Sequence, residues 1–240
     1  MPDVFADLIA RRADAVRARI ATAATASGRD PDAVTLVAVT KTHPVETVAA
    51  ALAAGLTDLG ENRVQELAEK AEAWPGAAGG GAHRWHLIGA LQRNKARDAA
   101  RLADLVHGVD SSRLAAALGA KAAEGGRELP VLVQVNVSGE ASKNGVAPEA
   151  AHGLMSEVAG TAGLRLVGVM GIAAPAEGDA DVARLVRPAF RRLRTLFDTY
   201  AGPGRDRLTT VSMGMSGDYG VAVEEGSTLV RVGTALFGAR

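Results

Sequence analysis

Apolar residues recur along the chain in two alternating patterns. From Val4 to Ile20 they return at steps of three and four residues, which predicts an amphipathic helix that ends near Ser27-Gly28. From Val34 to Thr40 the chain is rich in β-branched residues and apolar almost throughout, as in a strand buried on both faces. A helical pattern returns from Val45 to Ala54 and stops at Gly55. A leading helix is therefore followed by a strand and a helix.

The same alternation continues to the end of the chain. Further strands are predicted over residues 57–60, 85–89, 105–109, 131–137, 166–170, 208–212 and 229–232. Helices are predicted over residues 62–73, 93–102 and 111–124, from Pro148 onward, and over 181–200. About eight strand-helix units fit a (β/α)8 TIM barrel, which typically has roughly 250 residues. The alternative, an open doubly wound sheet, usually needs fewer strands, and no Gly-x-Gly-x-x-Gly turn follows the first strand.

We therefore expect residues 1–240 to form a single α/β domain. It is predicted to be a (β/α)8 barrel with an extra N-terminal helix, residues 1–28, packed on its outside.

Composition excludes several classes of function. Lys and Arg total 27, and so do Asp and Glu, which argues against the broad cationic surface of a nucleic-acid or membrane binder. With no cysteine, disulfides, thiolate catalysis and cysteine-ligated metals are ruled out, and the five histidines lack the spacing of metal ligands. The N-terminus lacks the apolar core of a signal peptide, and no apolar run approaches the roughly 18 residues of a membrane span. We expect a cytoplasmic protein without a metal.

Lys41 is the first candidate for chemistry, because it directly follows the first predicted strand. In a barrel the carboxyl ends of the strands carry the active site. The chain has only five lysines among its 27 basic residues, and lysine alone can form a Schiff base with a carbonyl. An ordinary solvated lysine is the other interpretation of Lys41. Lys70 and Lys121 have the pattern of solvated helix faces.

A second candidate region lies at the ends of the seventh and eighth predicted strands. Small residues around Ser216 and Gly233 allow backbone N–H groups to approach an anion, and Ser216 and Thr234 add hydroxyl groups. Many barrels bind phosphate at this place. Arg231, between Val230 and Val232, is costly to bury unless it meets an anion or a ring acceptor. We expect Arg231 to face the mouth of the barrel, whereas the glycines alone are equally consistent with tight turns.

These pieces together resemble the pyridoxal phosphate homeostasis proteins, also called YggS or PROSC proteins. The matching segments run in order from near residue 34 to the C-terminus: Ala38-Val39-Thr40-Lys41-Thr42-His43-Pro44, Gly60-Glu61-Asn62, Trp85-His86-Leu87-Ile88-Gly89, Leu91-Gln92-Arg93-Asn94-Lys95, Gln134-Val135-Asn136-Val137, Ser142-Lys143-Asn144-Gly145, Gly168-Val169-Met170-Gly171-Ile172, Met213-Gly214-Met215-Ser216 and residues 226–238.

The resemblance implies a barrel like the N-terminal domain of alanine racemases, with pyridoxal 5'-phosphate (PLP) held as a lysine aldimine. By motif, Lys41 is the Schiff-base lysine, Arg231 faces the pyridine nitrogen, and the phosphate is held by Ser216, Gly233 and Thr234. Asn62 and His86 are expected to line the ring pocket, and Met213 and Met170 to pack beside the cofactor or in the core.

The chain departs from the family pattern at two positions. His43 stands where many members have a second lysine, and Tyr219 replaces an aliphatic residue or Met after the phosphate motif. Lys143 matches another family lysine and is either a secondary contact or a solvated loop residue.

The resemblance favours a carrier that buffers PLP and delivers it to PLP-dependent apoenzymes, without turnover of its own. The alternative is an amino-acid racemase or another PLP enzyme. Racemisation needs a second acid or base, which alanine racemases obtain from a tyrosine of a second subunit together with an additional β domain. The chain ends at Arg240, directly after the eighth predicted strand, and Tyr200 and Tyr219 are its only tyrosines. We therefore expect a monomeric carrier. A barrel enzyme acting on phosphosugars through Lys41 is a third interpretation, although it leaves Arg231 unexplained.

Overall fold

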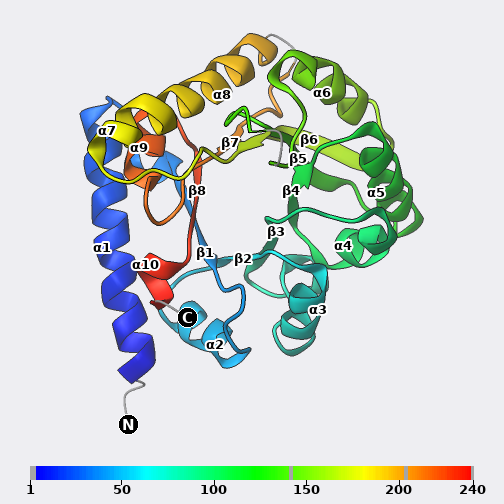
Figure 1. Cartoon of the computed structure of the whole chain (residues 1–240). Helices are drawn as coiled ribbons and strands as arrows, with labels where there is room; N and C mark the ends of the chain where they lie inside the picture. Colours follow the sequence, from blue (N-terminus) through cyan, green and yellow to red (C-terminus); the bar gives the residue numbers. More distant parts are fainter. Residues whose placement is uncertain (1–3, 141–142, 203–204, 239–240) are drawn as a thin grey trace.

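Eight parallel strands form a closed barrel in the computed structural model, which describes residues 4–140, 143–202 and 205–238 (Figure 1). Each strand pairs with the next in sequence, and β1 pairs with β8 to close the ring. The strands are β1 (Thr35–Val39), β2 (Asp58–Glu61), β3 (Arg84–Leu87), β4 (Leu105–Val109), β5 (Leu129–Val135), β6 (Leu164–Gly171), β7 (Thr210–Ser212) and β8 (Leu229–Val232). The predicted barrel is thereby confirmed, and the open sheet is excluded.

Helices surround the barrel on its outside (Figure 1). They are α1 (Val4–Ala26), α2 (Glu46–Ala53), α3 (Val64–Ala73), α4 (Ala96–Leu102), α5 (Ser112–Glu124), α6 (Ala151–Ala159), α7 (Asp179–Asp181), α8 (Arg187–Tyr200), α9 (Tyr219–Glu224) and α10 (Thr234–Phe237). The predicted N-terminal helix is confirmed as α1, which packs along α2, α9 and α10. Its buried face includes Ile9, Ala13, Val16 and Ile20, at the helical spacing that predicted it.

The largest difference from the predicted elements lies before α8. Residues 182–186 form a π-helical turn, and regular α-helix begins only at Arg187. Pro188 has no amide hydrogen to donate to the preceding turn, so the ordinary hydrogen-bond ladder is interrupted there. Strand β5 also starts two residues earlier than predicted, at Leu129.

Alternation along the strands, interrupted by a bulge in β6, separates two layers of buried side chains. One layer, which includes Val211 and Met213, packs between the barrel and the helices. The other fills the barrel interior with apolar side chains: Val37, Val39, Ile88, Leu105, Leu132, Val167, Met170 and Leu229. Ser212, which lies between Val211 and Met213, therefore points into the barrel.

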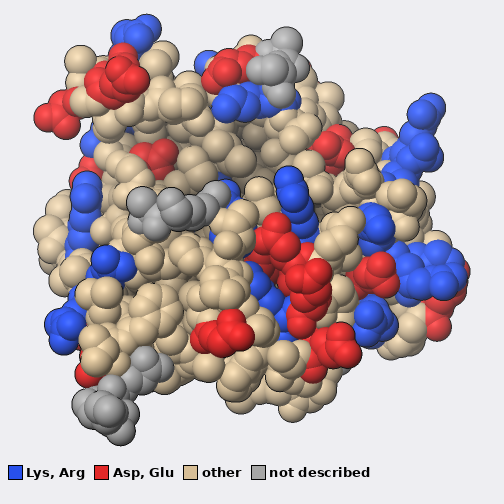
Figure 2. Space-filling view, turned by 60° about the horizontal axis from the view of Figure 1, so that its bottom comes forward, with Lys and Arg blue, Asp and Glu red and all other residues tan. Residues whose placement is uncertain are grey.

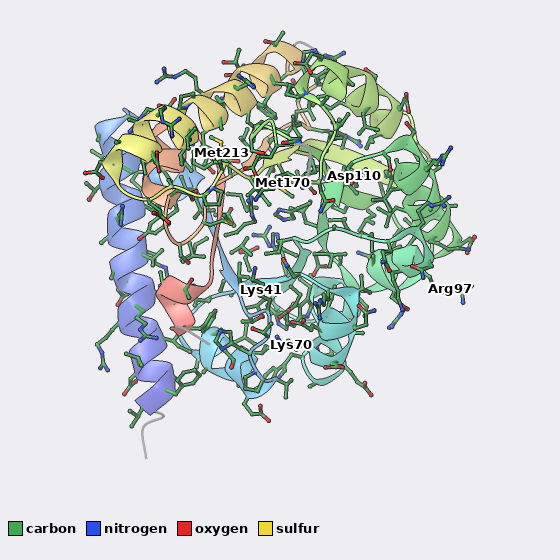
Figure 3. The ribbon with its side chains drawn as sticks, in the orientation of Figure 1. Lys41, Lys70, Arg97, Asp110, Met170 and Met213 are labelled. Atoms are coloured by element: carbon green, nitrogen blue, oxygen red, sulfur yellow. The ribbon has the colours of Figure 1, made fainter. Side chains whose placement is uncertain are left out.

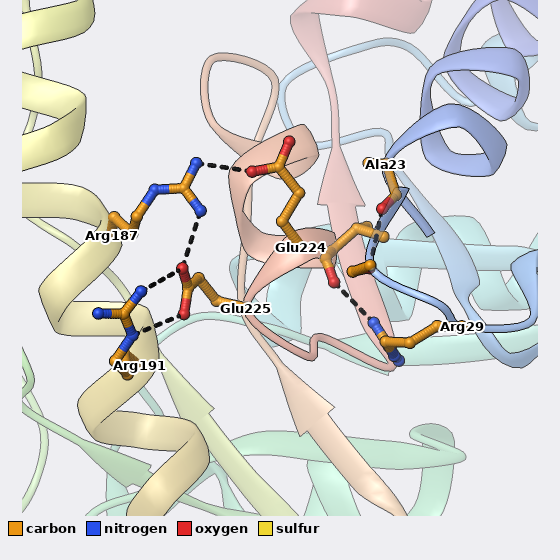
Figure 4. Close-up of polar contacts among 8 residues, drawn as sticks. Ala23, Arg29, Arg187, Arg191, Glu224 and Glu225 are labelled. Carbon is orange, nitrogen blue, oxygen red and sulfur yellow. Dashed lines mark hydrogen bonds and ion pairs between the residues drawn. The ribbon is translucent and has the colours of Figure 1, made fainter. Parts of the chain in front are cut away.

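Ion pairs join α8 to α9 at the side of the barrel (Figure 4). Arg187 contacts Glu224 at 2.6 Å and Glu225 at 2.8 Å, and Arg191 contacts Glu225 at 3.0 Å. Charged groups of both signs are interleaved over the face in Figure 2, as a net charge of zero suggests. Over the described ranges, no helix has both the length and the apolar character needed to span a membrane.

Candidate functional site

A cavity of about 450 Å³ lies at the carboxyl ends of the strands. Its volume is in the range of small-molecule sites, and its position is where barrels carry their chemistry. The cavity is lined by Val39, Lys41, Asn62, Ile88, Gly89, Ala90, Gln134, Asn144, Ile172, Met215, Ser216, Gly217, Arg231, Gly233 and Thr234. Six residues singled out from the sequence are thus brought together: Lys41, Asn62, Ser216, Arg231, Gly233 and Thr234.

Lys41 is presented by a strained turn directly after β1. The side chain of Thr40 is buried, Lys41 is half-buried, and Thr42 has a left-handed backbone with φ 62°. Such a conformation is unfavourable for threonine. The Thr42 amide donates a hydrogen bond of 2.8 Å to the Glu66 carboxylate, which holds the turn in place. Figure 3 shows Lys41 within the ring of helices. The backbone that carries the Lys41 side chain is therefore held at the cavity wall by the turn.

Arg231 points inward from β8 and forms part of the cavity floor. Its side chain donates hydrogen bonds to the Ser212 hydroxyl at 2.6 Å and to the Gly171 carbonyl at 3.1 Å. Burial lowers the pKa of Arg231 to about 10, while the carboxylate of Asp218 acts in the opposite direction. The guanidinium is therefore still charged at neutral pH.

Backbone donors and a hydroxyl converge where β7 and β8 end. Ser216 Oγ accepts hydrogen bonds from the amides of Gly233 at 3.2 Å and Ala235 at 3.3 Å. The preceding turn depends on Gly214, which has φ 96° and no room for a side chain: a Cβ would lie 2.6 Å from that of Ala222. Amide and hydroxyl groups that converge in this way suit an anion such as a phosphate.

Lys70 lies inside the protein, so the prediction of a solvated lysine is wrong. Its side chain is 5% exposed, and its ammonium group is 2.5 Å from Glu61 Oε1 and 2.7 Å from the carbonyl oxygen of Thr40. The hydroxyl of Thr40 also donates to Glu61 Oε1, at 2.6 Å. Burial raises the pKa of Glu61, although hydrogen bonds from Lys70 and Thr40 act against that rise. Figure 3 labels Lys70 and Lys41, the buried and the cavity-lining lysine.

The structure does not bring His86 and Met213 to the cavity. His86 points into the barrel, but two positions before Ile88, so it lies one layer of inward side chains below the cavity wall. Met213 is fully buried in the layer between the barrel and the helices. Because Ser212 points inward, strand alternation turns Met213 outward.

The other residues noted in the sequence also lie outside the cavity lining. The His43 ring packs against Phe237, with centroids 5.3 Å apart. Lys143 is half-buried in the loop next to Asn144. Tyr200 is buried at the end of α8, and Tyr219 is buried in α9 beneath the guanidinium of Arg19.

Several lining residues were not singled out as site residues. Gln134 and Asn144 are joined by a hydrogen bond of 3.1 Å from the Gln134 side chain to the Asn144 carbonyl. The sequence did contain a signal for Gln134, which is the one polar residue in the apolar strand β5. In the structure Gln134 is 5% exposed. Ile172 and Met215 follow β6 and β7 and carry no comparable signal.

The fold and the cavity define a barrel of the alanine racemase type. The family described as "Alanine racemase, N-terminal domain" matches residues 12–240. An alanine racemase of Clostridium difficile shares the fold, with a TM-score of 0.72 at 16% identity over 98% of this chain and 57% of that chain.

Similarity over the whole length identifies a narrower family. The pyridoxal phosphate homeostasis protein of Pseudomonas aeruginosa is 47% identical over 97% of this chain and 96% of its own length. The Escherichia coli protein of the same name is 40% identical over 97% of both chains. The solved structure of PipY from Synechococcus elongatus with PLP bound has a TM-score of 0.78 at 35% identity, covering 96% of this chain and 100% of that chain. This chain belongs to the pyridoxal phosphate homeostasis protein family.

Proposed function

We propose that this chain binds PLP in the cavity at the carboxyl end of the barrel and serves as a carrier of the cofactor. The observation that carries the proposal is the set of groups around one cavity: the amine of Lys41, the guanidinium of Arg231, and the hydroxyl and amide donors around Ser216. PLP has an aldehyde, a ring nitrogen and a phosphate, so each part of the cofactor has a matching group. PipY, a relative of 35% identity, has been solved with PLP bound, which supports PLP as the ligand.

Each residue has a distinct part in the proposal. The Lys41 amine condenses with the aldehyde, forming a C=N bond and releasing one water. Ser216, Gly233 and Thr234 hold the phosphate, and Arg231 faces the ring nitrogen. Asn62 lines the cavity beside the ring, whereas His86 and Met213 have no direct contact in this proposal. When bound, PLP supplies an electron-withdrawing ring.

Arg231 makes the site better suited to holding PLP than to carbanion chemistry. A guanidinium stays charged and has no proton to give at neutral pH, so the ring nitrogen that it faces remains unprotonated. An unprotonated ring withdraws electrons less strongly. The site that we propose therefore holds PLP without making its ring a strong electron acceptor for carbanion formation.

The cavity lining also favours a carrier over a racemase. Among the described residues that line it, Lys41 and Arg231 are the ionisable ones. Racemisation through two bases needs a second proton donor or acceptor opposite the lysine. Tyr219 is instead buried beneath Arg19. This chain also matches the homeostasis proteins over nearly their whole length, but only 57% of an alanine racemase.

The family resemblance extends the proposal to the cell. It includes PLP-dependent apoenzymes as recipients of the cofactor, a cytoplasmic location, a monomeric state and one PLP-binding domain over residues 1–240.

The test is the absorbance spectrum of the purified protein with PLP, before and after borohydride reduction. We expect a band in the wild-type protein that reduction traps on Lys41, as mass spectrometry of peptides would show, and no such band in Lys41→Ala. Lys121→Ala is the matched control, because Lys121 pairs with Glu124 on the helix α5. Absence of a band in the wild-type protein would refute PLP binding. Racemisation of amino acids by the loaded wild-type protein would refute the carrier and favour the enzyme.

A further inference from the structure

Below the cavity, an unbroken series of hydrogen bonds crosses the interior of the barrel. Arg231 Nη1 lies 2.6 Å from Ser212 Oγ, and Ser212 Oγ lies 3.0 Å from His107 Nδ1. His107 Nε2 lies 3.0 Å from His86 Nδ1, and His86 Nε2 lies 2.8 Å from Asp58 Oδ1. The five side chains come from five different strands. We call Asp58, His86, His107 and Ser212 the interior chain.

The interior chain lies where barrels usually contain branched aliphatic residues. Ser212 and His107 are fully buried, and His86 and Arg231 are 2% and 4% exposed. Polar groups at such depth are costly unless each is hydrogen-bonded. A continuous polar series in an apolar interior therefore points to a role beyond packing.

The two ends of the series have fixed roles in hydrogen bonding. Arg231 can only donate and the Asp58 carboxylate can only accept. Four contacts are then satisfied by one hydrogen from each of Arg231, Ser212, His107 and His86. In the arrangement that we propose, each imidazole carries one hydrogen, on Nε2, and has a bare Nδ1. Burial lowers the pKa of His107 well below its usual value, and the charge of Arg231 acts in the same direction, which agrees with a neutral His107 ring.

The far end of the series is fixed at the amino ends of the strands. Arg84 contacts the Asp58 carboxylate at 2.7 Å. Burial opposes ionisation of Asp58, but hydrogen bonds from His86 and Arg84 outweigh it and lower the pKa of Asp58. A second cavity, of about 260 Å³, is lined by His86 and Arg84 at this end of the barrel. The series thus spans the barrel from the amino-end cavity to the floor of the carboxyl-end cavity.

We propose that the interior chain positions Arg231 for the ligand. One guanidinium nitrogen of Arg231 donates to the Ser212 hydroxyl and the other donates to the Gly171 carbonyl. These two hydrogen bonds fix the cation in the cavity floor. Donation runs in one direction, toward Asp58, so the residues behind Arg231 hold no additional proton that could move toward the ligand. The assignment rests on the proposed function, because it takes the ring of PLP as the group that Arg231 faces.

Nitrogen-15 NMR of the imidazoles tests the direction of the hydrogen bonds without any ligand. We expect His107 and His86 each to carry one hydrogen, on Nε2, at neutral pH. A hydrogen on Nδ1 of His107, or a doubly protonated ring, would overturn the proposal.

Spectra of the PLP adduct test the positioning role. Ser212→Ala removes the acceptor next to Arg231, and Asp58→Asn alters the far end of the series. We expect Ser212→Ala to weaken PLP binding about tenfold and to shift the absorbance maximum, with a smaller shift in the same direction for Asp58→Asn. Ser212→Thr restores the hydroxyl and should recover most of the wild-type spectrum. His83→Phe is the matched control, since His83 is a buried histidine outside the series.

The outcomes separate this proposal from the proposed function. If Ser212→Ala and Asp58→Asn bind PLP with unchanged affinity and spectrum, the interior chain has no positioning role, although PLP binding stands. If Ser212→Ala does not fold, Asp58→Asn and the NMR result decide. If the wild-type protein forms no adduct, the proposed function fails and the positioning of Arg231 for PLP fails with it, whereas the NMR result still determines the hydrogen-bond directions.

Discussion

The ammonium group of Lys70 donates a hydrogen bond of 2.7 Å to the carbonyl oxygen of Thr40, the residue immediately before Lys41. The same ammonium group pairs with Glu61, which also accepts a hydrogen bond from the Thr40 hydroxyl. An ion pair in the protein interior thus holds Thr40, the residue that follows β1, in place. The backbone next to Lys41 is therefore held by two side chains, Lys70 and Glu61, that do not line the cavity.

Substitution Lys70→Met is expected to destabilise the protein strongly. It leaves the Glu61 carboxylate buried without its cationic partner, and removal of one member of a buried pair costs about 3–5 kcal/mol. Urea denaturation of the ligand-free protein measures the loss. In Lys70→Met/Glu61→Gln the uncompensated charge is gone, so we expect part of the stability to return. A loss below about 1 kcal/mol for the single variant would show that the pair contributes little.

Substitution Gly214→Ala is expected to disturb the turn that leads to Ser216. The added methyl group would meet Ala222, and alanine is unfavourable at φ 96°. We expect a loss of about 1–3 kcal/mol in the free energy of unfolding and weaker binding of PLP. Gly153→Ala, on α6, has open space around the new methyl group, lies outside the cavity lining and is the control. Equal effects of the two variants in thermal melts and PLP titrations would contradict this explanation.

Substitution Ser216→Ala is expected to weaken PLP binding about 10- to 100-fold, since a hydrogen bond to a charged group contributes about 1.5–3 kcal/mol. The loss should be smaller for pyridoxal, which has no phosphate. Titration with the two ligands, followed by absorbance, measures the difference. Ser156→Ala is the control, because Ser156 contacts Tyr200 in the helical layer. An equal loss for both ligands would place the phosphate elsewhere.

The pairing of α8 with α9 is expected to weaken in acid. Burial opposes ionisation of Glu225, but hydrogen bonds from Arg191 and Arg187 outweigh it and lower its pKa below the ordinary 4.5. A lowered pKa in the folded state stabilises the protein above the ordinary pKa, and this stabilisation is lost as pH falls through the lowered value. Glu225→Gln should cost up to about 1 kcal/mol at pH 7, because solvent screens part of the attraction.

Urea denaturation at pH 7 and at pH 3 checks this dependence. The difference between wild type and Glu225→Gln should shrink at the lower pH. Glu157→Gln, an exposed position on α6, is the control. A difference that stays constant between the two pH values would exclude an electrostatic origin.

The barrel could be predicted from the sequence because its strands are buried on both faces and its helices on one. A strand buried on both faces is apolar almost throughout, as from Val34 to Thr40. A helix buried on one face has apolar residues at steps of three and four, as from Val4 to Ile20. The π-helical turn before α8 could not be predicted in the same way. It results from the local effect of Pro188 within a long amphipathic pattern.

Site residues could be predicted where they stand at the end of a strand. They could be predicted less well where the depth of the side chain in the protein determines whether it reaches the cavity. Lys41 and Arg231 stand at strand ends, so the topology brings them together. His86 also lies on a strand next to the cavity, but its height along the barrel axis depends on strand register, which sequence periodicity does not determine. Lys70 lies in a helical Glu69-Lys70-Ala71-Glu72 segment that resembles a solvated face, and its burial depends on Glu61 in β2.

The pairing of β1 with β8 has a consequence for the order in which the site forms during synthesis. Val37 on β1 is in register with Arg231 on β8, so the barrel closes by joining the first strand to the last. Lys41 leaves the ribosome early, whereas Arg231, Gly233 and Thr234 emerge almost two hundred residues later. A nascent chain therefore carries the Lys41 amine long before it has the groups to which we assign the ring and the phosphate of PLP. We therefore expect PLP to be retained only once the last strand has docked.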